Sequence, residues 1–134
     1  MKILGIDYGT KRIGLAISDE THTLAREYAI WPAVEVDDEF WRKLMELIDT
    51  EDIEKIVLGM PLNMSGESTQ KSEEVQKFNQ VLQQQVSVPV ELVDERLSSV
   101  MAENLSGQMS GQHQQIDSLA AQIFLQNYLN QNKK

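Results

Sequence analysis

The sequence contains no cysteine among its 134 residues, which excludes disulfide bonds and thiolate metal sites. Its two histidines, His22 and His113, both stand among polar neighbours, as surface residues do more often than metal ligands. No apolar run approaches the roughly 20 residues of a membrane-spanning helix. The N-terminus has the pattern of a strand and not of a signal peptide. We therefore expect a single domain over residues 1–134, located in the cytoplasm and without a membrane partner.

Basic residues are also few, and the formal net charge of −9 argues against simple binding to nucleic acid. The distribution of charge weakens that argument. Residues 35–54 hold nine acidic side chains against Arg42 and Lys43, whereas residues 1–34 and 95–134 each carry equal numbers of acids and bases. The acidity therefore belongs mostly to one predicted helix and its flanks, for which a solvated helix face is the simplest interpretation.

Hydrophobic periodicity and turn residues predict an α/β organisation that begins with antiparallel strands. The expected strands cover residues 3–6, 12–18, 23–31, 55–58 and 88–93, and the expected helices cover 37–48, 67–85, 98–105 and 115–129. Strands that are separated by helices pair in parallel through crossover connections. The prediction is therefore a mixed five-stranded sheet, with an antiparallel meander followed by parallel strands, flanked by helices.

One carboxylate, Asp7, stands at the end of the first strand, which is otherwise almost wholly apolar. A buried anion is costly unless a cation, a hydrogen bond or water meets it. Gly9 lies in the turn that follows and would let backbone approach a ligand closely. The segment therefore suits a metal or phosphate site at the edge of the sheet. A hairpin with a turn-capping aspartate explains it equally well.

Further acids are expected at the same edge, because ligands gather at the carboxyl ends of parallel strands. Residues 94–96, Asp-Glu-Arg, directly follow a predicted strand. Asp117 lies in the first turn of the last predicted helix and shares a face with apolar residues. Clustered carboxylates suit Mg²⁺ or Mn²⁺ and metal-assisted phosphodiester hydrolysis. The alternatives are ordinary loop acids and, for Asp117, an acid stabilised by the helix dipole.

Four segments of the chain resemble, in order, the motifs of the YqgF (RuvX) family: Ile6-Asp7-Tyr8-Gly9-Thr10-Lys11-Arg12-Ile13-Gly14-Leu15-Ala16, Gly59-Met60-Pro61-Leu62-Asn63 with Ser65-Gly66, Asp94-Glu95-Arg96-Leu97-Ser98, and Ile116-Asp117-Ser118-Leu119-Ala120-Ala121 with Tyr128-Leu129. The resemblance implies an RNase H-like fold and a bacterial cytoplasmic nuclease. The implied substrate is pre-16S rRNA, trimmed at its 5′ end during ribosome biogenesis. An older assignment of the family is cleavage of branched DNA, as a Holliday junction resolvase.

The resemblance also implies the roles of individual residues. Asp7, Glu95 and Asp117 correspond to the family's catalytic, metal-binding acids, with Mg²⁺ or Mn²⁺ as cofactor. The implied substrate-binding residues are Gly9, Lys11, Arg12, Arg96 and Ser98. Guanidinium groups pair bidentately with phosphate oxygens, although either arginine could instead hold a neighbouring carboxylate. The chain departs from the family at residues 106–115, which carry no permanent charge, so we expect weaker binding of nucleic acid.

Two rival functions remain open at this point. ATPases of the actin, Hsp70 and sugar-kinase type also begin with a strand, an aspartate and a Gly-Thr turn, but they need two such domains, and this chain has one copy. A nucleic-acid-binding module without turnover could use the same fold, because function depends on the site. Other expected partners are a ribosomal particle and a second copy of the chain, since junction resolution needs two active sites.

Overall fold

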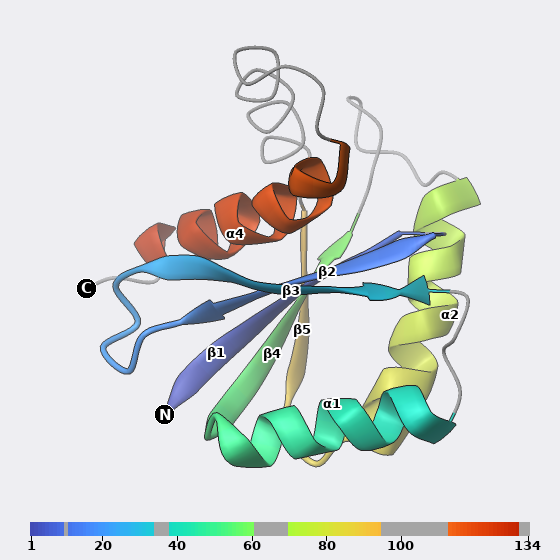
Figure 1. Ribbon diagram of the computed structural model, residues 1–134, viewed down its shortest axis with the longest axis horizontal. Coiled ribbons are helices and arrows are strands. Elements are labelled where there is room, and N and C mark those ends of the chain that lie inside the picture. Colours follow the sequence, from blue (N-terminus) through green and yellow to red (C-terminus); the bar gives the residue numbers. More distant parts are fainter. Residues whose placement is uncertain (10, 34–37, 61–69, 95–112, 132–134) are drawn as a thin grey trace.

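The sheet at the centre of the molecule has five strands, in the order β3-β2-β1-β4-β5 (Figure 1). The computed structural model describes residues 1–9, 11–33, 38–60, 70–94 and 113–131. The strands are β1 (Lys2–Tyr8), β2 (Arg12–Ser18), β3 (Ala25–Pro32), β4 (Ile53–Met60) and β5 (Val90–Asp94). Helices α1 (Asp38–Thr50) and α2 (Gln70–Gln85) lie on one side of the sheet, and α4 (His113–Gln131) lies on the other.

The pairing of the strands confirms the predicted mixed sheet. Both β1 and β3 pair antiparallel with β2, whereas β1 and β5 pair parallel with β4. This arrangement puts β1, the predicted bearer of the catalytic acid, at the centre of the sheet. Its apolar residues are buried on both faces, as the sequence predicts.

The boundaries of the elements differ from the predictions by a few residues. The third strand, predicted over residues 23–31, runs instead from Ala25 to Pro32, which pairs with Arg12. This position tolerates proline because β3 is an edge strand, where a missing N–H need not break a ladder. The helix predicted at 98–105 lies outside the described residues, and so does the start of the one predicted at 67–85.

The two faces of the sheet carry side chains of different size. Large residues face α1 and α2, among them Leu4, Ile6, Leu15 and Leu58, all of which are fully buried. Aromatic rings extend this core. Phe78 of α2 stacks on Tyr8 of β1 at 4.5 Å between ring centroids, and on Trp41 of α1 at 5.6 Å. The stack ties the carboxyl end of β1 to both helices.

Small residues face α4 and allow this helix to approach the sheet closely. A Cβ atom on Gly5 would lie 3.2 Å from Cβ of Leu125. The neighbouring β2 contributes Ala16 to the same apolar cluster. Gln126 of α4 accepts a hydrogen bond from the backbone N–H of Ala25 at 2.8 Å and donates one to the carbonyl of Thr23 at 2.9 Å. Packing and hydrogen bonds together fix the position of α4 across β1, β2 and β3.

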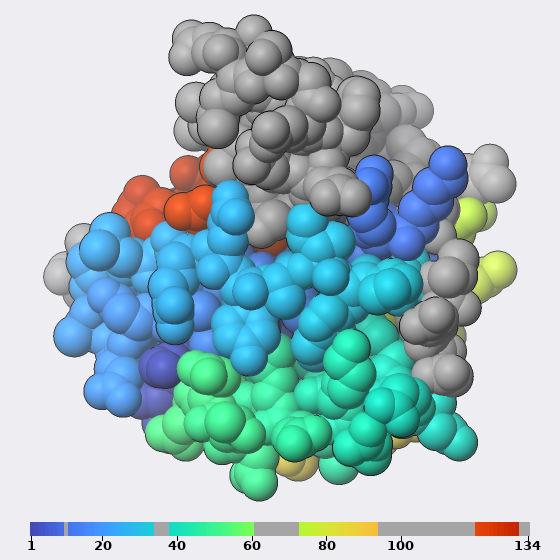
Figure 2. Space-filling view, viewed as in Figure 1, coloured from blue at the N-terminus to red at the C-terminus, as the bar shows by residue number. Residues whose placement is uncertain are grey.

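The acidic helix α1 covers part of the molecular surface beside β3 (Figure 2). Its exposed face carries an ion pair between Arg42 and Glu39 at 2.6 Å and a looser one with Glu46 at 3.7 Å. Because these three side chains are more than 60% exposed, the prediction of a solvated helix face is confirmed. Among the described residues, no helix is long and apolar enough to cross a membrane.

Candidate active site

Asp7 is a buried acid on the α4 face of the central strand. It is the next-to-last residue of β1, and 9% of its surface is exposed. Successive residues of a strand point to opposite faces, so Asp7 shares a face with Ile3, which packs against α4. Tyr8 points to the other face, where it stacks on Phe78. The structure thus places the predicted acid beneath the last helix and anchors the residue beside it.

Glycines flank Asp7 in both neighbouring strands. Gly14 of β2 pairs directly with Asp7. On the other side, Leu58 of β4 pairs with Ile6, so Gly59 is the residue of β4 beside Asp7. Neither neighbour has a side chain that could cover the carboxylate. Asp7 therefore lies between two strand positions, Gly14 and Gly59, that have no Cβ atom.

The geometry of the turn after Asp7 explains why residue 9 is a glycine. The Gly9 N–H donates to the carbonyl of Arg12 at 2.9 Å, and a Cβ atom at Gly9 would lie 2.6 Å from that oxygen. Glycine is thus needed to close the turn, independently of any ligand. The carbonyl of Lys11 accepts a hydrogen bond from the N–H of Ala33 at 2.9 Å. The side chain of Lys11 is exposed and that of Arg12 is half-buried.

The carboxyl ends of β4 and β5 lie at the same edge of the sheet as Asp7. Gly59 pairs with Val93, and Met60 pairs with Asp94. Val93 packs against the apolar cluster under α4, whereas Met60 belongs to the core on the opposite face. Gly59 and Val93 thus lie at this end of the sheet on the same face as Asp7.

The backbone of Asp117 lies within α4, two turns before the buried residues Phe124 and Leu125. The structure does not describe its side chain. Glu95, Arg96 and Ser98 lie outside the described residues. Within the described part of the chain, no three His, Cys, Asp or Glu side chains lie close enough together to hold a metal ion.

A second polar site, which the sequence analysis missed, lies at the opposite edge of the sheet. His22 was expected to be a plain surface residue, but its Nε2 lies 2.7 Å from Glu54 Oε1 and 3.0 Å from the Met1 carbonyl oxygen. Lys55 and Glu91 form an ion pair at 2.7 Å nearby. These contacts join segments that are far apart in the sequence, so no local sequence pattern predicts them.

Comparison with known proteins identifies the same family as the sequence motifs do. A family model described as "RuvX: Holliday junction resolvase" matches residues 1–131. A protein of Maridesulfovibrio salexigens named "Putative pre-16S rRNA nuclease" is 40% identical over 133 residues, which cover 96% of this chain and 98% of that protein. A Streptococcus sanguinis protein of the same name is 38% identical over 138 residues, covering 98% and 99% of the two chains.

Solved structures with a similar fold include two complexes with branched DNA. RuvC of T. thermophilus bound to a Holliday junction substrate superposes with a TM-score of 0.59 at 15% identity, over 98% of this chain and 94% of that one. The Fowlpox virus resolvase bound to Holliday junction DNA gives a TM-score of 0.54 at 16% identity, over the whole of both chains. At these identities the likeness establishes the RNase H-like resolvase fold alone.

Proposed function

This chain belongs to the RuvX family, and from that premise we propose that it is a divalent-metal-dependent nuclease that processes the 5′ end of pre-16S rRNA. The relatives that share 38–40% of its residues over nearly their whole length carry a pre-16S rRNA nuclease name. The observation that carries the proposal is the position of Asp7, buried between two glycines at the carboxyl end of the central strand and on the face covered by α4.

The packing of α4 supports Asp117 as a second catalytic acid. Gly5 lies beneath Leu125, and Ile3 and Leu129 line the same cavity at the amino end of β1, so β1 and α4 run in opposite directions. Two strand residues and four to five helical residues both span about 6.6 Å. We therefore infer that Asp7 is level with residues near 121 and that Asp117 follows one turn beyond.

The order of faces along β5 supports Glu95 as the third acid. Val93 packs against the apolar cluster under α4. If the alternation of a strand continues beyond Val93, the acid two residues later returns to the face of Asp7. Together the three acids would offer only carboxylate oxygens, a donor set that fits Mg²⁺ or Mn²⁺. When bound, such an ion activates water and stabilises the charge that develops on the phosphate.

Basic residues near this edge are suited to hold the substrate. Lys11 is exposed on the turn that follows Asp7, and Arg12 begins the returning strand. We assign to them contacts with the phosphate backbone, together with the backbone of Gly9 and the side chains of Arg96 and Ser98. We further place the activity in the cytoplasm, on precursor rRNA or on a ribosomal particle that contains it.

The decisive experiment assays the purified protein on precursor 16S rRNA and on a four-way DNA junction, with Mg²⁺, with Mn²⁺ and with a chelator. We expect cleavage of the rRNA that requires the metal and is lost in Asp7→Asn. The matched control is Asp49→Asn, an exposed aspartate of α1. Cleavage in the presence of the chelator, or full activity of folded Asp7→Asn, would contradict the assignment.

The family description favours a second candidate, resolution of Holliday junctions. A junction resolvase cuts two strands at symmetric positions and so needs two active sites, which one copy of this chain does not contain. A stable homodimer that cleaves the four-way junction faster than the rRNA would favour this alternative. Binding of either substrate without cleavage under any metal condition would identify a binding module.

A further inference from the structure

A cavity of about 870 Å³ lies at the edge of the sheet opposite to Asp7. It is bounded by the first residues of β1, β4 and β5, by the turn between β2 and β3, and by the end of α4. Its volume falls within the range of small-molecule sites, roughly 300–1,000 Å³. This end of the molecule is distant from the candidate active site, so a ligand bound in the cavity would be separate from the nuclease substrate.

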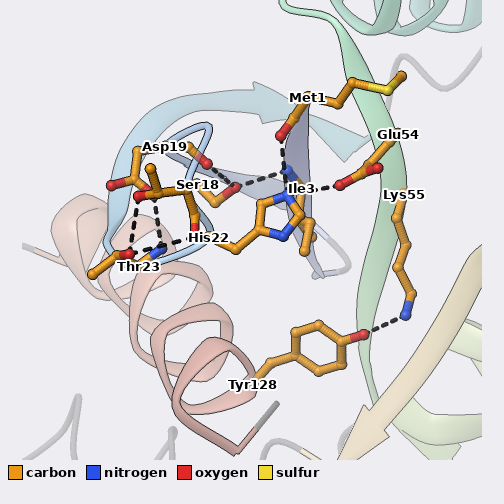
Figure 3. A network of polar contacts seen from close by, with 10 residues as sticks. Met1, Ile3, Ser18, Asp19, His22, Thr23, Glu54, Lys55 and Tyr128 are labelled. Carbon is orange, nitrogen blue, oxygen red and sulfur yellow. Dashed lines mark hydrogen bonds and ion pairs between the residues drawn. The ribbon is translucent and has the colours of Figure 1, made fainter. Parts of the chain in front are cut away.

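One wall of the cavity is a polar cluster from three elements. Lys55 Nζ of β4 donates to the hydroxyl of Tyr128 on α4 (Figure 3). The same Nζ lies 2.7 Å from Glu91 Oε1 of β5. The Tyr128 hydroxyl lies 3.3 Å from the same Oε1. Burial acts to lower the pKa of Lys55, but its hydrogen bonds with Glu91 and Tyr128 outweigh burial and raise this pKa above 10.5. Lys55 is therefore an ammonium, and it holds Glu91 by one oxygen.

The opposite wall is the pair of His22 and Glu54. Figure 3 shows the imidazole pointing from the β2–β3 turn toward the glutamate of β4. His22 has a φ of 57°, in the left-handed region that side chains other than glycine rarely adopt. The backbone N–H of His22 donates to the Asp19 carbonyl at 3.2 Å within this turn. The imidazole Nε2 lies 2.7 Å from Glu54 Oε1, so this carboxylate too is held by one oxygen.

Both carboxylates keep one oxygen available for a ligand. All the polar contacts of Glu54 and Glu91 within the described residues go to Oε1. Between them the cavity has an apolar lining, to which Ile3, Val90 and Leu129 contribute. Lys55 balances one of the two negative charges, and His22 adds a positive charge only when protonated. A ligand that fits must therefore donate hydrogen bonds at two points and be apolar between them.

We propose that this cavity binds an aliphatic diamine or polyamine. One ammonium group donates to Oε2 of Glu54, another donates to Oε2 of Glu91, and the methylene chain lies on the apolar lining. The register places Glu91 beside Val57, three residues after Glu54, so the two backbone positions are at most about 10 Å apart along the strand, since β4 is irregular at Glu54. The net charge of −9 adds a general attraction for cations. An anion would meet two carboxylates and be repelled.

The test uses calorimetric titration of the full chain with 1,4-diaminobutane, with spermidine and with n-butylamine as the single-charge comparison. We expect saturable binding of one diamine or polyamine per chain. Butylamine should bind about tenfold more weakly, because it forfeits one charge-assisted hydrogen bond. Equal affinity for butylamine and the diamine, or no saturation at physiological salt, would overturn the proposal.

Three variants locate the binding. Glu54→Gln and Glu91→Gln should each reduce diamine affinity about tenfold, toward that of butylamine. The matched control, Glu46→Gln, removes the same charge from an exposed position on α1 and should leave affinity unchanged. An equal loss in all three variants would mean diffuse attraction to an acidic protein and would refute a defined site.

A measurement on the unaltered chain covers the case in which a variant does not fold. A carbon-13 NMR titration of the glutamate side-chain carboxyl groups reports the environment of each glutamate. Spermidine should shift the resonances of Glu54 and Glu91 but not that of Glu46. Equal shifts of all three, or no shift of any, would refute the proposal. None of these readouts depends on nuclease activity.

Discussion

The two faces of the sheet are built on opposite principles. Toward α1 and α2 the strands present large apolar residues and Tyr8, on which Phe78 of α2 stacks and, through it, Trp41 of α1. Toward α4 the same strands present Gly5, glycines on either side of the candidate active-site acid, and small apolar residues. Because consecutive residues of a strand alternate between faces, both surfaces come from the same short segments.

The difference in side-chain size assigns stability mainly to one face of the sheet and the candidate active site to the other. Large buried side chains contribute most of the favourable free energy of folding, and they leave no room for a polar substrate. Small residues contribute less, but they allow a helix to approach the backbone and leave space around an acid. Substitutions on the large-residue face should therefore affect mainly the free energy of unfolding. Substitutions on the small-residue face should affect mainly nuclease activity.

The largest effect is expected on the large-residue face. Phe78→Ala removes the middle ring of the stack and should lower the free energy of unfolding by about 3–5 kcal/mol, as truncation of buried aromatic residues does. Urea denaturation measures this difference. The control is Val81→Ala on the same helix, where the side chain is 41% exposed and the expected change is within about 0.5 kcal/mol. Equal effects of the two substitutions would refute the stabilising role of the stack.

The next effect is expected on the small-residue face. Gly5→Val places side-chain atoms against Leu125, whose Cβ lies 3.2 Å from the first atom added, so α4 must move away. We expect a loss of about 1–3 kcal/mol in the free energy of unfolding, as for other overpacked sites. Nuclease activity should fall much further than unfolding explains, because α4 carries Asp117.

The sign of this change is informative. Valine suits a strand better than glycine does, so Gly5→Val would stabilise the protein if α4 were loosely packed. A second substitution, Leu125→Ala, should restore part of the stability by making room, and the double-mutant cycle measures this coupling. Additive effects of the two substitutions would contradict close packing at this point.

The smallest effect is expected outside both faces, in the turn that carries His22. The backbone N–H of Thr23 donates to Asp19 and has the largest effect, which lowers the pKa of this carboxyl. Loss of solvent opposes it, the N–H of Leu24 adds to it, and the pKa lies below the ordinary 3.8. A depressed pKa in the folded state means stability that is present above pH 3.8 and lost as the pH falls through the folded pKa.

Asp19→Asn measures this contribution. The wild type should be slightly more stable than the variant near neutral pH, and the difference should shrink as the pH falls below the ordinary pKa of the group. Thermal unfolding across this range is the measurement. A difference that stays constant with pH would show that the charge on Asp19 does not matter. A change in nuclease activity would contradict its placement away from the active site.

Local patterns predicted the sheet and one acid of the candidate site. The almost wholly apolar run before Asp7 predicted a strand buried on both faces, which the structure confirms, whereas the different sizes of the two faces were not predicted. The turn residues and the helical periodicity of α1 gave the order of elements. The end of β3 could not be predicted, because Pro32 is acceptable only on an edge strand. Whether a strand lies at the edge of a sheet depends on tertiary structure and is not visible in the local sequence.

Tertiary contacts could not be predicted in the same way. Lys55, Glu91 and Tyr128 come from three segments, and nothing near any of them indicates the others. The contact of His22 with Glu54 likewise joins the β2–β3 turn to another strand. Gly9 was explained by an approaching ligand, whereas the structure shows that the Arg12 carbonyl already requires it. Convergence of Glu95 and Asp117 on Asp7 remains a prediction.

The hydrogen bonds of Gln126 to the start of β3 have a consequence for biosynthesis. They join residues about a hundred positions apart, so the strands made first are covered by the helix made last. During translation the hairpin of β1 and β2 can form early, but its α4 side stays bare until the end of the helix leaves the ribosome. A nascent chain stalled before that point would present Ile3, Ala16 and Ala25 to chaperones or to other unfinished chains.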